Sequence, residues 1–231
     1  MKALKLNPLF IALLAAGLVS GAALAEESKD PNRDSTKAQP SETAQAVDNL
    51  LLANQLAAYA QSNNDALGMV VAARMIQDQP TSPSTAQKEG GTDDDASEAS
   101  ITVEDLLKQA REQSGGRAEI VALIDETATR TVTKGKVGGP IVHNDRVRGN
   151  TIDIFRNLKF KGGEVAIIGV LAGSHTDIDC SVYDQNGNLI VSDTDGTSTC
   201  ALRWKPLWTG PFRLEISNLG SKANSYRIIT N

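Results

Sequence analysis

The hydrophobic pattern of the chain changes its period once, near Pro140, and this change constrains the fold more than any other feature. Before it, apolar residues recur at helical spacing in segments rich in Ala, Leu and Gln. After it, short runs alternate apolar and polar side chains between Gly, Asn and Pro turns. A period of 3.6 predicts amphipathic helices, and a period of two predicts half-buried strands. Because the two kinds of segment form separate blocks, we expect an α+β fold with segregated helices and sheets.

The first helical block, residues 41–79, predicts an antiparallel hairpin of two helices. Ser41 precedes the first arm, and Asn64 or Asp65 precedes the second after the interruption "SNND". Short polar side chains at these places accept hydrogen bonds from the free N–H groups of a first helical turn. We therefore expect both helices to begin at side-chain caps.

Each arm of this predicted hairpin carries one apolar face. The positions near helical spacing are Val47, Leu51, Gln55 or Leu56, and Tyr59 on the first arm, and Leu67, Val71 and Met75 on the second. Such a stripe normally packs against the core of the protein. The same Ala- and Leu-rich faces would also serve self-association or the binding of a partner protein.

Polar segments flank this hairpin. Residues 26–40 lack periodicity, and residues 80–100 combine Pro, Ser and Gly with an acidic run, so we expect disorder in the first and a flexible acidic linker in the second. Residues 101–133 then contain short helices and a connector. Thr102 and Asp105 are spaced as a capping box that opens the first of these helices.

The N-terminus has the features of a secretory signal peptide over residues 1–25. Lys2 and Lys5 precede an apolar run that closes on Ala23-Leu24-Ala25, a small-x-small cleavage pattern. Cleavage near Ala25 predicts a periplasmic or secreted protein, with no later segment apolar enough to span a membrane. The formal net charge is −5, and this acidity argues against a nucleic-acid partner.

Residues 134–231 contain seven or eight strand candidates at the spacing of one antiparallel β-sandwich. Cys180 and Cys200 are the two cysteines of the chain, and in an exported protein such a pair favours a disulfide. Period-two alternation lets both point into the core. A bridge between them would close a loop of about twenty residues and add on the order of 3 kcal/mol.

Five aspartates lie around one turn signal in this region, at Asp177, Asp179, Asp184, Asp193 and Asp195. The turn "DQNGN" permits two registers. A two-residue turn on Asn186-Gly187 sets Asp179 opposite Thr194. A longer turn, with Gly187 in the left-handed region, sets Asp179 opposite Asp193 and Asp177 opposite Asp195.

In the longer register four carboxylates share one face of the hairpin, which is destabilising unless something neutralises them. Calcium, which takes roughly six to eight oxygen ligands, is one candidate for that role. The other interpretation is a charged edge that discourages pairing with other chains. The sequence requires no cofactor, and it leaves calcium as a hypothesis.

The same region resembles a known family. The segments "DIDCSVYDQNGNLIVSD", "CALRWKPLWTGPFRLEISNLG" and "NSYRIITN" are similar to the bacterial pre-peptidase C-terminal domain over about residues 150–231. The resemblance implies a jelly-roll-like β-sandwich, an accessory module of secreted proteases that binds calcium in some members, with Asp177, Asp179 and Asp184 on matching positions. Here helices and a linker precede the module, and no peptidase domain does.

No constellation in the chain indicates catalysis. Ser174, His175 and Asp177 have the residue types of a triad, but neighbouring residues on an extended chain point to opposite faces. His143 lies in a polar segment, which predicts an exposed, solvated side chain. We therefore expect a protein that is not an enzyme.

Three aromatic residues, Trp204, Trp208 and Phe212, surround the segment "WKPLWTGPF". If exposed, they would stack on a sugar ring or dock an extended peptide; if buried, they belong to the core. The leading interpretation is an exported binding or envelope interaction protein with a protein, peptide or polysaccharide ligand. The alternatives are an accessory or regulatory partner of a secreted hydrolase, or a hydrolase itself.

Overall fold

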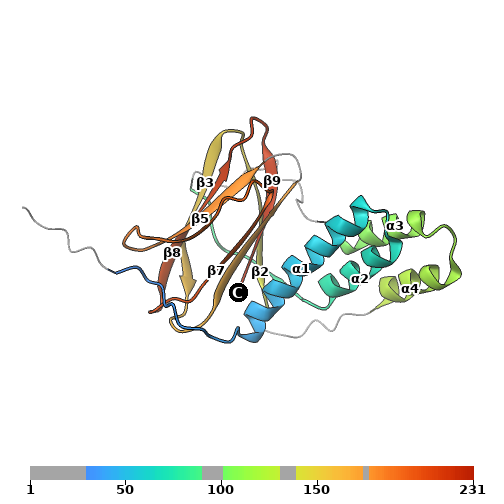
Figure 1. Ribbon diagram of the computed structural model, residues 1–231, viewed down its shortest axis with the longest axis horizontal. Coiled ribbons are helices and arrows are strands. Elements are labelled where there is room, and N and C mark those ends of the chain that lie inside the picture. The colour runs from blue at the N-terminus through green and yellow to red at the C-terminus, as the bar shows by residue number, and fades with distance from the viewer. Residues whose placement is uncertain (1–29, 90–100, 131–138, 174–176) are drawn as a thin grey trace, which may run out of the picture.

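The computed structural model describes residues 30–89, 101–130, 139–173 and 177–231. In these residues a bundle of four helices stands beside a two-layered β-sandwich (Figure 1). The expected α+β segregation is therefore confirmed. The predicted signal peptide and the pair Ser174-His175 lie outside the described residues.

Four helices form the bundle: α1 (Glu42–Ser62), α2 (Ala66–Gln77), α3 (Val103–Gln113) and α4 (Ala118–Thr129). Three predicted caps are confirmed. Ser41, Asp65 and Thr102 each accept a hydrogen bond from the backbone N–H three residues later, at 3.2, 3.0 and 3.0 Å. Such a cap stabilises a helix by about 1 kcal/mol, so local signals fix where these helices begin.

The sandwich contains the strands β2 (Ile141–Val147), β3 (Thr151–Phe160), β4 (Ala166–Ala172), β5 (Ile178–Asp184), β6 (Leu189–Asp193), β7 (Thr199–Trp204), β8 (Gly210–Asn218) and β9 (Asn224–Thr230). One sheet has the order β1-β2-β9-β4-β7, where β1 is Ser82–Pro83, and the other has the order β3-β8-β5-β6. From β2 to β9, only the β5–β6 connection stays within one sheet. This alternation is that of a jelly roll, which confirms the predicted sandwich.

The core between the sheets is closed by a disulfide. Cys180 of β5 and Cys200 of β7 are fully buried and form a bridge with their Cα atoms 6.1 Å apart. Because β5 and β7 belong to different sheets, the bridge joins the two layers. The predicted disulfide and the inward direction of both cysteines are confirmed.

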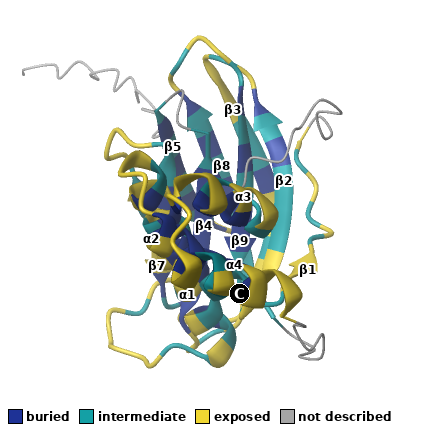
Figure 2. Cartoon of the chain, turned by 90° about the vertical axis from the view of Figure 1, so that its right-hand side faces the viewer, coloured by how far each residue is buried: buried dark blue, intermediate teal, exposed yellow. Residues whose placement is uncertain are grey.

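Helix α1 belongs to both parts of the molecule. Its first half packs on the outer face of the β2-β9-β4-β7 sheet, and its second half packs in the bundle. Strand β4 is therefore buried on both faces, as the dark blue ribbon behind α1 shows (Figure 2). Gly169 of β4 makes this docking possible, because a Cβ atom there would lie 2.3 Å from Cδ2 of Leu51.

The predicted flexible linker over 80–100 is wrong for residues 82–89, here named the closing strap. β1 pairs with β2, Lys88 forms a bridge with Phe155 of β3, and the Glu89 N–H donates to the Ile154 carbonyl at 2.8 Å. The closing strap therefore crosses from one sheet to the other and covers the sandwich edge between β2 and β3. Backbone pairing holds a segment whose composition alone predicts disorder.

The prediction of disorder over 26–40 also needs correction, since residues 30–40 are placed along the sandwich. Asn32 is fully buried, and its side-chain amide exchanges two hydrogen bonds of 3.0 Å with the backbone of Trp208. The Asp34 N–H donates to the carbonyl of Lys205 at 2.7 Å. We call residues 30–36 the N-terminal strap. In the described part of the chain, no helix is long and apolar enough to cross a bilayer.

Candidate functional site

The β5–β6 hairpin uses the longer of the two predicted turns. Asp184 donates its N–H to the Asn188 carbonyl at 3.0 Å, and Gly187 donates to the Asp184 carbonyl at 3.1 Å. Gly187 has a φ of 86°, which places it in the left-handed region where glycine is favoured. The sequence permitted this turn beside a two-residue one, and the structure selects the longer turn.

A β-bulge nevertheless changes the register of the aspartates. Tyr183 pairs with Leu189 and Val182 with Val191, so the buried Ile190 is an extra residue. Beyond the bulge, Cys180 rather than Asp179 lies opposite Asp193. The predicted pairing of Asp179 with Asp193 is therefore wrong. The bulge adds Ile190 to β6, and this extra residue shifts the register of the rest of the strand by one position relative to β5.

Asp184 is a structural anchor of this hairpin. Its carboxylate is buried and accepts hydrogen bonds from the N–H groups of Asn186 and Asn188, from the Asn188 side chain, and from the N–H of Asn32, at 2.8–3.0 Å. Burial acts to raise the pKa of Asp184, but the hydrogen bonds from Asn188, Asn32 and Asn186 outweigh it and lower the pKa. The carboxylate thus ties the turn to the N-terminal strap.

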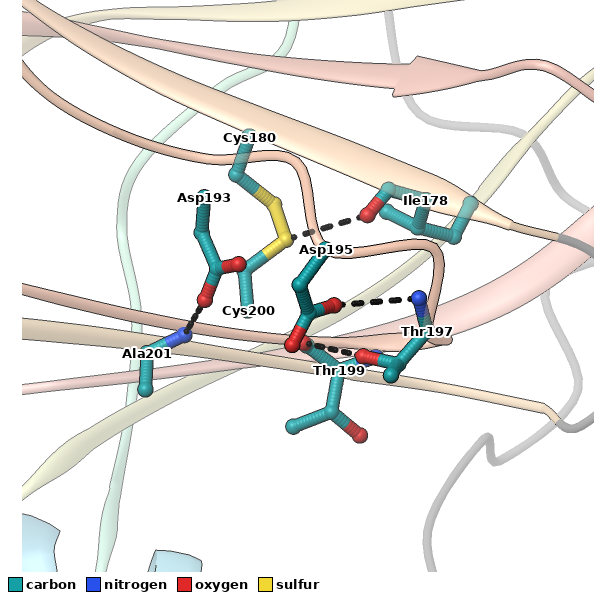
Figure 3. Close-up of a disulfide and its surroundings, with 8 residues drawn as sticks. All are labelled: Ile178, Cys180, Asp193, Asp195, Thr197, Thr199, Cys200 and Ala201. Atoms are coloured by element: carbon teal, nitrogen blue, oxygen red, sulfur yellow. Dashed lines mark hydrogen bonds between the residues drawn. A yellow bond between two sulfur atoms is a disulfide. The ribbon is translucent and has the colours of Figure 1, made fainter.

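Two further carboxylates of the predicted metal set are also engaged by backbone groups (Figure 3). Asp193 accepts from the N–H of Ala201 on β7 at 2.9 Å and so connects the edges of the two sheets. Asp195 accepts from the N–H of Thr197 at 3.0 Å within its own loop. Both side chains support the backbone beside the disulfide.

The pKa of Asp179 is affected by the neighbouring carboxylates of this hairpin. Partial burial, followed by the charges of Asp177, Asp193 and Asp195, raises its pKa. The charges of these three carboxylates therefore disfavour the ionised form of Asp179. Yet in the described residues no three acidic, histidine or cysteine side chains are grouped as metal ligands.

The aromatic residues proposed as ligand contacts divide into two groups. Trp204 and Phe212 are buried in the sandwich core, where their ring centroids lie 5.2 Å apart. Trp208 is 36% exposed at the surface, where its backbone holds Asn32. One exposed ring beside the N-terminal strap does not form the stacking platform that three aromatic rings would provide.

A different apolar surface, absent from the predicted sites, lies on the helical hairpin. The residues predicted as the buried face of α2 point to solvent: Leu67 is 48% and Val71 41% exposed. On α1, Leu52 is 54% and Tyr59 63% exposed. Helix α2 instead contributes Ala66, Ala72 and Ala73, with Met69 and Val70, to a bundle core that Leu and Ile side chains of α3 and α4 complete.

These exposed residues form one continuous surface. A Cβ atom at Gly68 would lie 2.9 Å from that of Ala60, which marks the line along which α1 and α2 touch. With 3.6 residues per turn in two antiparallel helices, the exposed residues of both helices lie on the same side of that line. We name this surface the apolar stripe. It consists of the exposed Leu52 and Tyr59 of α1 and Leu67 and Val71 of α2, together with the partly buried Leu56 and Met75.

A buried group of charges lies under the closing strap. Lys88 Nζ donates to Asp145 Oδ1 at 2.9 Å, to Asp153 Oδ2 at 3.2 Å and to the Arg146 carbonyl at 3.0 Å. The side chains of Lys88 and Asp145 are 8% and 0% exposed. We name Lys88, Asp145 and Asp153, with the two aromatic neighbours described next, the buried ion cluster.

Tyr226 and His143 complete the buried ion cluster. The Tyr226 hydroxyl donates to Asp153 Oδ2 at 2.8 Å, and His143 Nε2 lies 3.3 Å from Asp145 Oδ2. Burial raises the pKa of Asp153 against the opposing effects of Tyr226 and Lys88, and burial also raises the pKa of Tyr226. His143 is therefore a largely buried residue of β2, and the prediction of a solvated histidine is wrong.

A cavity of about 680 Å³ lies between the bundle and the outer face of the sheet. Its walls include Leu50, Ile76 and Val142, and Arg227 is its charged lining residue. The buried ion cluster does not open into it. The cavity therefore brings together none of the residues discussed above as candidate chemistry.

Comparisons with known proteins show distant structural similarity alone. No protein-family model matches the chain, and no curated protein matches it. A pre-peptidase C-terminal domain of a collagenase from Bacillus anthracis matches with a TM-score of 0.32 and 12% identity, over 39% of this chain and 87% of that one. A mitogen from Yersinia pseudotuberculosis also gives a TM-score of 0.32 and 12% identity, over 41% and 86%. These similarities assign no function.

Proposed function

We propose that this chain is an exported, non-catalytic interaction protein that self-associates through the apolar stripe on α1 and α2. The β-sandwich is the rigid base, and α1 connects it to the surface that meets the second copy. The observation that carries the proposal is the exposure of Leu52, Tyr59, Leu67 and Val71 on one side of the hairpin. Contiguous exposed apolar patches rimmed by polar residues mark interaction surfaces.

The charge distribution favours a second copy as the occupant. Residues 49–64 contain no charged side chain, although the chain as a whole carries a net charge of −5. Helix α2 contains one charged residue, Arg74, which is directed to α4, where it pairs with Glu126 at 3.1 Å. Asp65 and Asp78 are exposed at the two ends of α2, outside its uncharged middle. Two such hairpins can therefore meet about a two-fold axis with apolar rather than charged side chains at the centre of the contact.

Export is the second part of the proposal. A buried disulfide is typical of proteins that fold in oxidising compartments outside the cytoplasm. The sequence pattern that ends at Ala25 supports the same location. A periplasmic or secreted position would therefore suit both features.

The proposal is tested by measuring molar mass against concentration by sedimentation velocity. We expect reversible dimers in the micromolar range, and we expect Leu67→Glu combined with Val71→Glu to raise the dissociation constant at least about tenfold. Leu219→Glu is the matched control, since Leu219 is 57% exposed on the sandwich. A protein that stays monomeric up to about 100 μM contradicts the proposal, as does equal weakening by the control.

A further inference from the structure

The buried ion cluster has the composition and geometry of a self-modifying site. We propose that the folded protein joins Lys88 to Asp145 by an isopeptide bond between Lys88 Nζ and Asp145 Cγ. The inference is independent of self-association, because the cluster lies under the closing strap and the apolar stripe lies on the bundle.

Position is the first argument. The amine nitrogen of Lys88 lies 2.9 Å from Asp145 Oδ1, and Asp145 has no exposed surface. The bridge between Lys88 and Phe155 fixes the closing strap against β3, while β2 fixes Asp145. Two reactants held in this way avoid most of the entropy cost of a reaction between separate molecules.

The surroundings of the Asp145 carboxyl provide the second argument. Its Oδ1 atom accepts a hydrogen bond of 2.8 Å from the N–H of Arg146, which is placed to stabilise negative charge on that oxygen during attack at Cγ. Its Oδ2 atom lies 3.3 Å from His143 Nε2, within reach of proton transfer to a leaving oxygen. Both carboxyl oxygens therefore have a partner suited to amide formation.

Asp153 is the group that moves protons. Its Oδ2 atom lies 3.2 Å from Lys88 Nζ and accepts a second hydrogen bond from Tyr226. Before the reaction, burial acts to lower the pKa of Lys88, but Asp145 and Asp153 outweigh it and raise that pKa. The amine is therefore protonated, and it must give up a proton before it can act as a nucleophile. Burial raises the pKa of Asp153, which makes it a suitable acceptor for that proton.

The cost of buried charge favours the same route. One ammonium group lies against two carboxylates in the interior. The cluster takes up one proton, so that Asp145 reacts as the protonated carboxyl. Amide formation then removes both the ammonium group and the carboxyl group from the interior.

The reaction balances without any co-reactant. Lys88 transfers a proton to Asp153, and its neutral nitrogen attacks Cγ of the protonated Asp145 side chain. The C–N bond forms, the second nitrogen proton passes through His143 to the departing hydroxyl, and the C–O bond breaks as that oxygen leaves as water. Asp153 then releases to solvent the proton that the cluster took up before the reaction, which restores its carboxylate. No atom is oxidised or reduced.

The bond would covalently fasten the closing strap to β2. Lys88 and Asp145 are 57 positions apart, and α3 and α4 lie between them. Both helices would therefore belong to a closed ring that passes through the sandwich edge. The disulfide already joins β5 to β7, so each side of the sandwich would carry one covalent link.

The decisive experiment is intact mass spectrometry of the denatured, reduced, full-length protein after folding at neutral pH. We expect a mass about 18 Da below that of the sequence, one water, in the wild type. Tryptic digestion should yield residues 75–108 joined to residues 137–146, with no cleavage after Lys88. A wild-type protein of full mass, folded as judged by its disulfide and its circular dichroism, overturns the proposal.

Two variants and the peptide map distinguish this reaction from other losses of water. Asp153→Asn should keep the full mass, whereas Asp145→Asn should lose about 17 Da, one ammonia, and give the same product as the wild type. Asp195-Gly196 is a sequence that can also lose water by cyclisation. A mass loss that maps to residues 195–196 rather than to Lys88 overturns the proposal.

Discussion

The molecule contains two groups of carboxylates, and they differ in what surrounds them. The hairpin aspartates lie at a sheet edge, where backbone N–H groups hold Asp184, Asp193 and Asp195. The buried ion cluster holds two carboxylates around one lysine that comes from a distant segment. The first group is conspicuous in the sequence because its aspartates lie close together along the chain. The second group is not, but its ion pairs are buried and therefore less screened by water.

The largest expected loss of stability comes from a substitution in the buried ion cluster. Replacing Lys88 with Met removes the side chain that both Asp145 and Asp153 contact in the interior, which should lower the free energy of unfolding by about 3–5 kcal/mol. Lys161→Met is the control, because Lys161 pairs with Glu164 on the surface at 3.6 Å. Urea denaturation measures both. Equal losses of unfolding free energy in the two variants would contradict the stronger contribution of the buried ion cluster.

Asp184 should give the next largest effect, since it is the buried member of the hairpin group. Asp184→Ala removes the acceptor for the N–H groups of Asn32, Asn186 and Asn188, and should cost about 2–3 kcal/mol. Asp195→Ala, which removes one exposed hydrogen bond, should cost less than about 1 kcal/mol. The same urea titration tests whether Asp184 behaves as an anchor or as one more surface acid.

The pH dependence of stability should reveal the acids that hold the N-terminal strap. The hydrogen bond from Lys205, followed by that from the Thr36 N–H, lowers the pKa of Asp34 to about 2 from an ordinary 3.8. A lowered folded-state pKa contributes stability above pH 3.8 that is lost as the pH falls towards 2. Asp34→Asn should therefore flatten the curve of unfolding midpoint against pH in that interval. An unchanged slope would show that the ion pair to Lys205 is absent in solution.

Asp179 should show the smallest effect and the opposite sign. Burial and neighbouring charges raise its folded-state pKa, so its ionised form destabilises the fold, and the loss is relieved as the pH falls through that pKa. Asp179→Asn should raise the free energy of unfolding at pH 7 by up to about 0.5 kcal/mol.

Added calcium tests whether the hairpin aspartates form a cation site. Because backbone groups already engage Asp184, Asp193 and Asp195, millimolar calcium should stabilise the wild type over EDTA by less than about 0.5 kcal/mol. A larger rise in the melting temperature that disappears in Asp179→Asn would instead establish a cation site on the hairpin.

Local chemistry explains why much of the fold could be read from the sequence. Ser41, Asp65 and Thr102 cap helices through hydrogen bonds that reach only three residues along the chain. Period-two alternation is likewise local, and it placed Cys180 and Cys200 in the core. The turn at Gly187 was one of the two that the sequence allowed, and it uses a backbone conformation that glycine favours.

The candidate sites could not be read in the same way, because they depend on contacts between distant segments. Lys88 stands in a polar segment that composition assigns to a linker, and its partner Asp145 lies 57 positions away. The spacing of Leu67 and Val71 identifies an apolar face but not the side that faces the bundle. Small residues such as Ala60 and Gly68 decided that question by letting α1 and α2 approach closely.

By itself, the sequence determined the segregated α+β class, the helix starts, the inward faces of β5 and β7, and the disulfide, because each depends on periodicity or on residue type. Tertiary structure alone decided which charges are buried, which apolar face stays exposed, and which polar segments are ordered. The physical reason is that burial and long-range hydrogen bonding are properties of packed surfaces, and these arise only when segments far apart in the chain meet.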